Sequence, residues 1–381
     1  MYKLDRQQLE LKSKVRAFVE SEVIPAAQEL DRSGVFPAQL VKRCGELGLC
    51  SAELMSGGRY SAVKLCIILE ELARGCASLA LSLIPHYLAC DIMNSAISAE
   101  LRESVLDPGL RAEKLFAYAI SEESGGSDVL GIDTTALALD DEWIINGSKS
   151  WITSAGSADG YLIAARTTLS GRSRDLSLFY VDASAPGLIV DEPQDMIGLR
   201  SSPIGAIRLE NCRIPRGSIV GAEDAGYKLL KPTLQLGRLA IAAVASGISE
   251  RALELASGYA TVTGKYGRNL ASYQGISFML AEMYAKAAAS KCMVYCAAEQ
   301  YDAGERNIAA NVAAAKLMST EQACEICRSA RQIHGANGLS RAFEIDRCFR
   351  DAQMLTIAEG TSEICKIIIA NSVISSGSSL L

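Results

Sequence analysis

The chain has 381 residues, which is long enough for two or three domains, each with a buried core of its own. Hydrophobic residues make up 49% of the sequence and charged residues 22%, a balance that excludes a disordered protein. The formal net charge is -6 and no run of five like charges occurs, which excludes the basic surface typical of a nucleic-acid-binding protein.

The N-terminus and the cysteines indicate a soluble, cytoplasmic protein. Residues 1–6 lead directly into a mixed-charge helical pattern without the apolar centre of a signal peptide, and no apolar run is long enough to span a membrane. The 12 cysteines are scattered, so we expect buried thiols rather than disulfides. Cys324 and Cys327 form a C-x-x-C within a helical pattern, without a second pair to complete a zinc site, so we expect no metal site.

Residues 1–115 predict an all-helical N-terminal domain. Helical periodicity extends over residues 5–30, where we expect Pro25 to interrupt the helix. Phe36-Pro37 precedes a further helix, and residues 62–74 and 77–95 are apolar on nearly every side, as buried helices are.

Residues 116–223 predict a β-barrel or sandwich domain. Short apolar runs bounded by turn residues occur at 116–120, 134–139, 143–145, 161–165, 176–181 and 206–209. We expect tight turns at Asp140-Asp141 and at Asn146-Gly147.

Residues 224–381 return to a helical pattern. The segments 234–260, 272–303 and 308–333 are each long enough to cross a domain, as the helices of a four-helix bundle do. The predicted fold class is therefore α+β, with an all-α domain, a β-barrel or sandwich domain and a C-terminal four-helix bundle in that order.

One carboxylate near the C-terminus is a candidate catalytic group. Glu359 follows the apolar residues Met354, Leu355 and Ile357, and Gly360-Thr361 after it opens a helix. Poor hydration there would raise the pKa of Glu359 toward values useful for a general base. The same residues also fit a simple helix start, with Glu359 placed near the positive end of the helix dipole.

Two segments of the β domain are candidates for ligand binding. Residues 121–128 offer glycines, hydroxyls and backbone donors to a flat or phosphorylated ligand, although an ordinary turn has the same composition. Trp151 and Thr153 can share one face of a strand, and a core tryptophan would also explain the first of them. No dinucleotide fingerprint follows a strand and no P-loop motif occurs, which disfavours Rossmann and P-loop nucleotide binding.

Taken in order, these segments resemble the acyl-CoA dehydrogenases. The resemblance rests on residues 118–128, Trp151-Ile152-Thr153, Gln332-Ile333-His334-Gly335, Arg350-Asp351-Ala352 and residues 359–364, and it covers nearly the whole chain. It implies a flavoenzyme with FAD between the β domain and the C-terminal bundle. It also implies a homotetramer, or a dimer, in which FAD touches a neighbouring subunit.

The resemblance assigns roles to individual residues. Glu359 would take the α-proton of an acyl thioester while a hydride passes from Cβ to the flavin. The implied cofactor-binding residues are Tyr118, Ser121, Ser127, Trp151, Thr153, Lys265, Tyr266, Gln274, Gln332, Gly335, Thr361 and Glu363, and the implied substrate-binding residues are Ser127, Arg238 and Gly360. Some family members carry the base at the position of Gly237, so Glu359 is the remaining candidate here.

The chain departs from the family pattern at four positions. Thr263 replaces an arginine that reaches a neighbouring FAD, Ala336 replaces a glycine, Gln235 replaces a frequent acidic residue, and Ala358 replaces a frequent aromatic residue. Three hypotheses follow: an acyl-CoA dehydrogenase that passes electrons to an electron-transfer flavoprotein, a relative that oxidises an acyl or α-hydroxyacyl group on an acyl carrier protein, and a helical scaffold without flavin.

Overall fold

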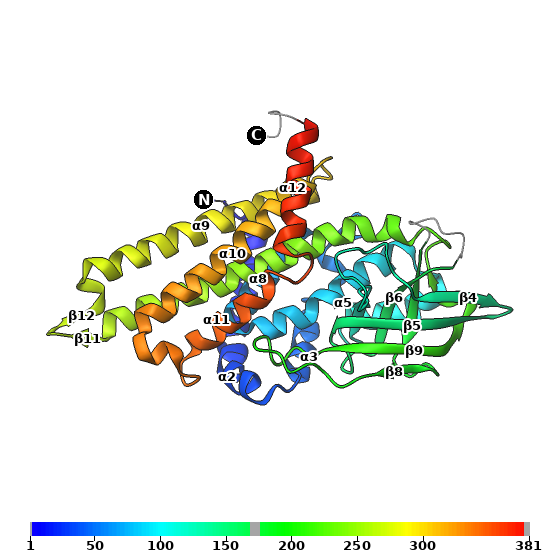
Figure 1. The fold of residues 1–381 in the computed structure, drawn as a ribbon, viewed down its shortest axis with the longest axis horizontal. Helices are drawn as coiled ribbons and strands as arrows, with labels where there is room; N and C mark the ends of the chain where they lie inside the picture. The colour runs from blue at the N-terminus through cyan, green and yellow to red at the C-terminus, as the bar shows by residue number, and fades with distance from the viewer. Residues whose placement is uncertain (1, 168–175, 377–381) are drawn as a thin grey trace.

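The computed structural model describes residues 2–167 and 176–376. Figure 1 shows a β domain at one end of an elongated body and a bundle of long helices at the other. The N-terminal helices lie against both. The predicted fold class, helical, then β, then helical, is confirmed.

The N-terminal helices begin with one nearly continuous helical segment. It comprises α1 (Arg6–Phe18), a π-helical turn (Val19–Val23) and α2 (Ile24–Ser33). The prediction that Pro25 interrupts this helix is therefore wrong. Pro25 stands in the first turn of α2, where the wider π-helical turn before it accommodates a residue that has no N–H to donate.

The remaining N-terminal elements build the central core. They are α3 (Ala38–Glu46), the hairpin of β1 (Met55–Ser56) and β2 (Arg59–Tyr60), α4 (Ala62–Gly75), α5 (Ala77–Ala96), α6 (Ala99–Leu101), a second π-helical turn (Arg102–Leu106) and α7 (Asp107–Leu110). As predicted, α4 and α5 are buried on almost every side. α4 packs closely on the C-terminal bundle, because a Cβ on Gly247 would come within 2.2 Å of the Glu70 carbonyl oxygen.

The β domain consists of two four-stranded sheets, with strand orders β10-β7-β6-β3 and β4-β5-β9-β8. The strands are β3 (Phe116–Ala119), β4 (Thr135–Leu139), β5 (Glu142–Thr153), β6 (Gly160–Ala165), β7 (Ser177–Asp182), β8 (Leu188–Val190), β9 (Ile204–Pro215) and β10 (Ile219–Val220). Trp143 and Phe179 meet edge to face between the sheets, with ring centroids 5.0 Å apart. A β-barrel or sandwich of short strands was predicted, and the two sheets form a sandwich; β8 and β10 were not predicted.

One of the two predicted turns is correct. Asp140 and Asp141 join β4 to β5. Asn146-Gly147 instead lies inside β5, where the register shifts between Ile145 and Gly147. The reason for the glycine is close packing, since a Cβ on Gly147 would lie 2.6 Å from Thr134 Oγ1.

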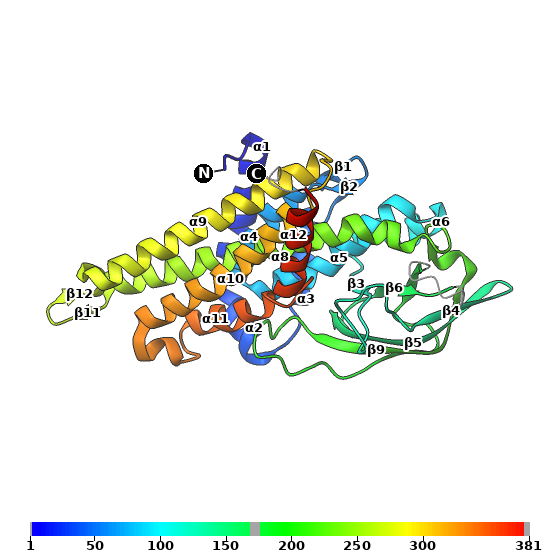
Figure 2. The same ribbon diagram turned by 45° about the horizontal axis from the view of Figure 1, so that its top comes forward.

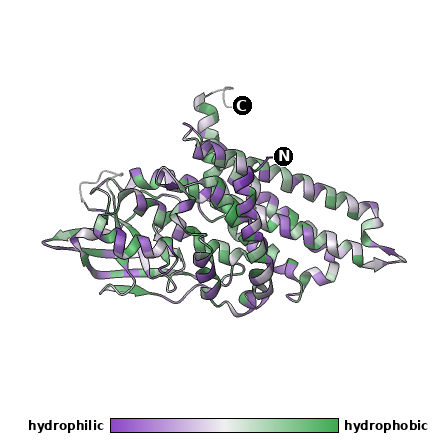
Figure 3. Ribbon diagram, turned by 180° about the vertical axis from the view of Figure 1, so that it is seen from behind, coloured by the Kyte–Doolittle hydropathy of each residue, from purple (hydrophilic) through white to green (hydrophobic). Residues whose placement is uncertain are grey.

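The C-terminal bundle contains α8 (Gly226–Val262), α9 (Gln274–Asp302), α10 (Ala309–His334), α11 (Glu344–Leu355) and α12 (Ser362–Ser376). α8, α9 and α10 run side by side in Figures 1 and 2, and the hairpin of β11 (Gly264–Lys265) and β12 (Arg268–Asn269) forms the tip of the bundle. Hydrophobic and hydrophilic residues alternate along the outer helices in Figure 3. Among the described helices, none is long and apolar enough to cross a membrane.

Candidate active site

Glu359 lies in the turn between α11 and α12. Its backbone is left-handed, with φ 52°, and Gly360 follows with φ 100°. Left-handed backbone costs a residue with a side chain about 1 kcal/mol or more, so the surrounding contacts must hold this turn in place. The predicted helix start is also present, because Thr361 Oγ1 accepts a hydrogen bond of 3.3 Å from the Ile364 N–H.

The Glu359 carboxylate lies in the space left by Gly237 of α8. A Cβ on Gly237 would come 2.5 Å from Glu359 Oε2, and 3.3 Å from Leu88 Cδ1 of α5. The absence of a side chain at position 237 therefore makes room for the carboxylate. Glu359 is thereby placed where α5, α8 and the turn before α12 meet.

The electrostatic surroundings of Glu359 suit a base. Burial raises its pKa, and the positive charges of Arg238 and Lys316 offset part of that rise. Arg238 is only 8% exposed, and its Nε lies 3.4 Å from where a Cβ on Gly360 would stand. A carboxylate whose pKa is raised in this way is a stronger base than an exposed one, as general-base catalysis requires.

Tyr118 of β3 lies close to the same charges. Burial raises the pKa of its hydroxyl far above the usual range, and the Glu359 charge raises it further. Within residues 2–167 and 176–376, neither Tyr118 Oη nor Arg238 Nε has a hydrogen-bond partner. Buried polar atoms in a protein core normally have hydrogen-bond partners, so two without partners beside one carboxylate are typical of a binding site.

A backbone hydrogen bond ties Ser121 to Ser150, the residue before Trp151. The Ser150 N–H donates a hydrogen bond of 2.9 Å to the Ser121 carbonyl oxygen. Trp151 has φ 61° at the irregularity between Lys149 and Ile152, and it is 63% exposed. The core-tryptophan interpretation of Trp151 is therefore wrong, because the bulge turns this ring outward.

Other predicted residues lie on the same two segments. Thr153 is the last residue of β5 and is partly buried. Ser127 is exposed in the loop after β3, and a Cβ on the neighbouring Gly126 would lie 3.6 Å from Ser121 Oγ. Glu363 is exposed in the first turn of α12.

A buried ion pair that sequence reasoning missed supports this region. Lys149 Nζ donates to Glu122 Oε1 at 2.6 Å and to the Ile120 carbonyl oxygen at 3.2 Å. Thr134 Oγ1 donates to the same carboxylate oxygen at 2.6 Å. Burial lowers the pKa of Lys149 to about 8. The sequence does contain a signal for the burial of Lys149. It lies an even number of residues after Trp143, so both side chains are expected on the same side of the strand.

A second missed residue is Lys316 of α10. It is completely buried, and its Nζ donates to the carbonyl oxygens of Gly360 at 2.6 Å and Thr356 at 3.1 Å. The only sequence signal was a lysine on a helix whose neighbouring positions are alanines, such as Ala313 and Ala314.

Five predicted cofactor residues lie elsewhere, at the tip of the bundle and around the hairpin of β11 and β12 (Figure 1). They are Lys265 and Tyr266 of the hairpin, Gln274 at the start of α9, Gln332 in the last turn of α10 and Gly335 just after it, and all five are exposed. Tyr266 is 97% exposed. Within one chain, the structure does not bring these residues to Glu359.

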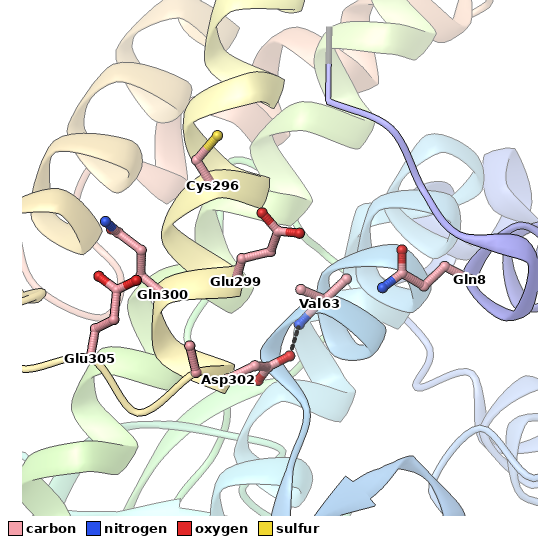
Figure 4. A pocket seen from close by; sticks show the side chains of 8 residues that line it. Gln8, Val63, Cys296, Glu299, Gln300, Asp302 and Glu305 are labelled. Atoms are coloured by element: carbon pink, nitrogen blue, oxygen red, sulfur yellow. Dashed lines mark hydrogen bonds between the residues drawn. The ribbon is translucent and has the colours of Figure 1, made fainter.

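A pocket between α1, α4 and α9, shown in Figure 4, is lined by acidic groups that bind other parts of the chain. Its volume is about 540 Å³. Asp302 accepts hydrogen bonds from the N–H groups of Ala62 and Val63 and so caps α4. Glu299 accepts a bond of 2.8 Å from the Tyr2 hydroxyl. Asp302 and Glu299 therefore have hydrogen-bond partners within the chain, and Glu359 does not line this pocket.

Family comparison accounts for the three parts of the chain. Residues 5–113 match the N-terminal domain of acyl-CoA dehydrogenases, residues 117–212 the middle domain and residues 224–374 the C-terminal domain. The probable acyl-CoA dehydrogenase FadE25 of Mycobacterium tuberculosis is 34% identical over 380 residues, covering 98% of this chain and 97% of the relative.

Two solved structures are similar over nearly the whole length. Butyryl-CoA dehydrogenase from Megasphaera elsdenii superposes with a TM-score of 0.93 at 28% identity, covering 98% of this chain and 100% of its own. The prolyl acyl carrier protein oxidase AnaB superposes with a TM-score of 0.90 at 27% identity, covering 97% and 100%. The chain therefore belongs to the acyl-CoA dehydrogenase family of oxidoreductases, which act on CH–CH groups.

Proposed function

We propose that this protein is an FAD-dependent dehydrogenase that introduces an α,β double bond into an acyl thioester. One observation carries the proposal: the Glu359 carboxylate occupies the space above Gly237, with a pKa raised by burial and restrained by two cations. An α-proton next to a thioester is weakly acidic, so it needs a desolvated base held in one position.

The residues on the β-domain side fit FAD. The Tyr118 hydroxyl lacks a partner, and Trp151 holds an exposed ring in a strained backbone conformation beside Ser121. Such strain is typical of positions that contact a ligand. The flavin, when bound, accepts the hydride that leaves Cβ. Tyr118, Ser121, Ser127, Trp151, Thr153, Thr361 and Glu363 are the proposed contacts.

The chain's own residues would carry the proton chemistry. Glu359 as carboxylate accepts the α-proton, and Arg238 keeps positive charge beside it. Ser127, Arg238 and Gly360 are proposed to contact the thioester. Because Glu359 must be ionised to accept the proton, and burial raises its pKa, we expect the reaction rate to rise with pH through that raised pKa.

The residues at the bundle tip fit a second role. Lys265, Tyr266, Gln274, Gln332 and Gly335 are proposed to contact the FAD of a neighbouring subunit in a homotetramer. Their exposure in the single chain supports this role, because they have room to meet another molecule. The proposed electron acceptor is an electron-transfer flavoprotein, and the proposed location is the cytoplasm.

A thioester on an acyl carrier protein is the second candidate substrate. Butyryl-CoA dehydrogenase and the carrier-protein oxidase AnaB both share this fold, so the fold supports either substrate. Ala358 stands beside the base where family members often carry an aromatic residue, and we propose that its small side chain makes room for a different acyl group.

The test is an anaerobic screen on purified protein reconstituted with FAD. We expect a yellow flavin spectrum that bleaches on addition of one class of acyl thioester, with acyl-CoA and acyl-carrier-protein forms of the same acyl group compared side by side. Protein that binds no FAD would favour the flavin-free scaffold instead. Bound FAD that no acyl thioester bleaches would contradict the proposed reaction.

A further inference from the structure

Lys316 forms a bridge beneath the turn that carries Glu359. Its side chain reaches from the middle of α10 to two carbonyl oxygens of that turn, at 2.6 Å on Gly360 and 3.1 Å on Thr356. Gly360 follows the base directly, and Thr356 precedes it by three residues. The ammonium group therefore links the residues on both sides of Glu359 in this loop.

The backbone of this loop is closed at the same point. The Ser362 N–H donates a hydrogen bond of 3.0 Å to the Thr356 carbonyl oxygen, which thus accepts from both Ser362 and Lys316. Glu359 and Gly360 hold positive φ values within this closed loop. The two charge-assisted hydrogen bonds from Lys316 on α10 therefore stabilise a loop that contains a left-handed, energetically unfavourable backbone at Glu359.

The charge of Lys316 is costly in this location. Its side chain is completely buried, and within the described residues no carboxylate oxygen lies within 4.0 Å of its ammonium nitrogen. Burial lowers the pKa of Lys316, and the positive charge of Arg238 lowers it further. The negative charges of Cys365, Glu359 and Glu321 act in the opposite direction. A buried ammonium without a close counter-ion is expected only where its charge or its donors serve a site.

We propose that Lys316 is a positioning residue for the base. Its ammonium group fixes the turn over residues 356–362 by hydrogen bonds to both ends, and its charge favours the ionised form of Glu359. This inference rests on the proposed function of Glu359, and it assigns to α10 a role that the resemblance did not include.

The test uses Lys316→Met, which removes charge and donors, and Lys316→Gln, which removes the charge but keeps an amide donor. Loss of the nearby positive charge should raise the pKa of Glu359 further in both variants, because Lys316 is one of the two cations that now hold it down. The protonated carboxyl of Glu359, identified by its loss in Glu359→Gln, is titrated by infrared difference spectroscopy on protein without FAD. The rising limb of the pH profile of flavin bleaching should move to higher pH by the same amount.

Loop order separates the two variants. Amide hydrogen exchange over residues 356–362 should become faster in Lys316→Met than in Lys316→Gln, and bleaching by substrate should slow by about 100-fold in Lys316→Met because the base is displaced. The matched control is Lys286→Met, which removes a surface lysine paired with Glu325 between α9 and α10. We expect neither the pKa of Glu359 nor the loop exchange to change in that control.

The outcomes distinguish this inference from the proposed function. Wild-type protein whose bound FAD no acyl thioester bleaches would overturn the proposed function, while the titration and exchange measurements would still report on the lysine. If wild-type protein is bleached but folded Lys316→Met shows an unchanged Glu359 pKa and unchanged loop exchange, the positioning role is overturned. A fall in melting temperature without either change would leave Lys316 with a structural role only, which also contradicts the proposal.

Discussion

The turn at Glu359 and the tip of the bundle carry two of the groups of residues that the family resemblance assigns to function, and they differ in how they are built. At the turn, α5, α8 and α10 converge on one carboxylate, with Gly237 and Lys316 both in contact with the loop. At the tip, Tyr266 and Val262 are 97% and 83% exposed. The first group is held in place by its own chain, and the second is not.

This difference separates two ways of making a site. The turn is preorganised, because each group around Glu359 is fixed by packing or hydrogen bonds before any ligand arrives. The tip offers exposed side chains, which would gain partners if another molecule covered them. Changes at the turn should therefore alter chemistry in every state of the protein, whereas changes at the tip should act only through assembly or cofactor retention.

The most damaging change is expected to be Glu359→Gln. The amide keeps the shape of the side chain but cannot accept the α-proton, so anaerobic bleaching should slow by at least about 1,000-fold while FAD stays bound. Stopped-flow absorbance of the flavin measures the rate. Glu325→Gln on the surface of α10 is the control, and bleaching by the Glu359 variant at the wild-type rate would remove Glu359 from the mechanism.

Gly237→Ala tests the packing of the carboxylate. The new Cβ would stand 2.5 Å from Glu359 Oε2, so the carboxylate must move, and a displacement of about 1 Å should slow bleaching by about 100-fold. Gly258→Ala, on the same helix α8 with no atom within 4 Å of its Cβ position, is the matched control. Equal rates in both variants would show that the position of the carboxylate is not critical.

Tyr266→Ala tests the other side of the comparison. A fully exposed side chain contributes little to the chain's own stability, so the melting temperature of the protein without FAD should stay unchanged. FAD affinity, measured by flavin fluorescence, should fall by about tenfold, because a lost aromatic contact is worth roughly 1.4 kcal/mol. The bleaching rate at saturating FAD should be unaffected. An unaltered FAD affinity would argue that the tip does not reach a neighbouring cofactor.

The smallest effect is expected for Tyr118→Phe. Its hydroxyl is buried without a partner in the described chain, so removing it should leave the protein without FAD as stable as before or more stable by about 1 kcal/mol. Binding of FAD or of the thioester should weaken by about fivefold if a bound group is the missing partner. Calorimetry with and without ligand measures both, and destabilisation of the ligand-free protein would contradict this account.

Much of the fold could be predicted because its signals are local. The helical periodicity of α8 to α10 and the short apolar runs of the β domain follow directly from the sequence. The π-helical turn before Pro25 was missed because the sequence pattern shows the proline but not the wider turn that accommodates it. Whether such a turn forms depends on how the helix packs against the rest of the chain. Asn146-Gly147 was misread because a glycine required by close contact with Thr134 looks the same as a turn glycine.

The site was only partly predictable for a similar reason. Glu359 could be found because apolar residues and a glycine surround it in the sequence. No role could be assigned to Lys316, because its hydrogen-bond partners are 40 or more residues away in the sequence. The same holds for Lys149, whose partner Glu122 is 27 residues away. The sequence shows that position 237 is a glycine and so cannot supply the base. Only the three-dimensional structure shows that the Glu359 carboxylate fills the space that a side chain at position 237 would take.

The outward position of Trp151 gives the protein a built-in optical signal. The chain has 2 tryptophans, and Trp143 is buried between the sheets whereas Trp151 is 63% exposed. Their emission should therefore differ in wavelength, with Trp151 dominating the red edge of the spectrum. A chromophore arriving at the face of the β domain would quench this red component and leave the emission of Trp143 less affected, so the occupancy of the site can be followed by fluorescence without labels or turnover.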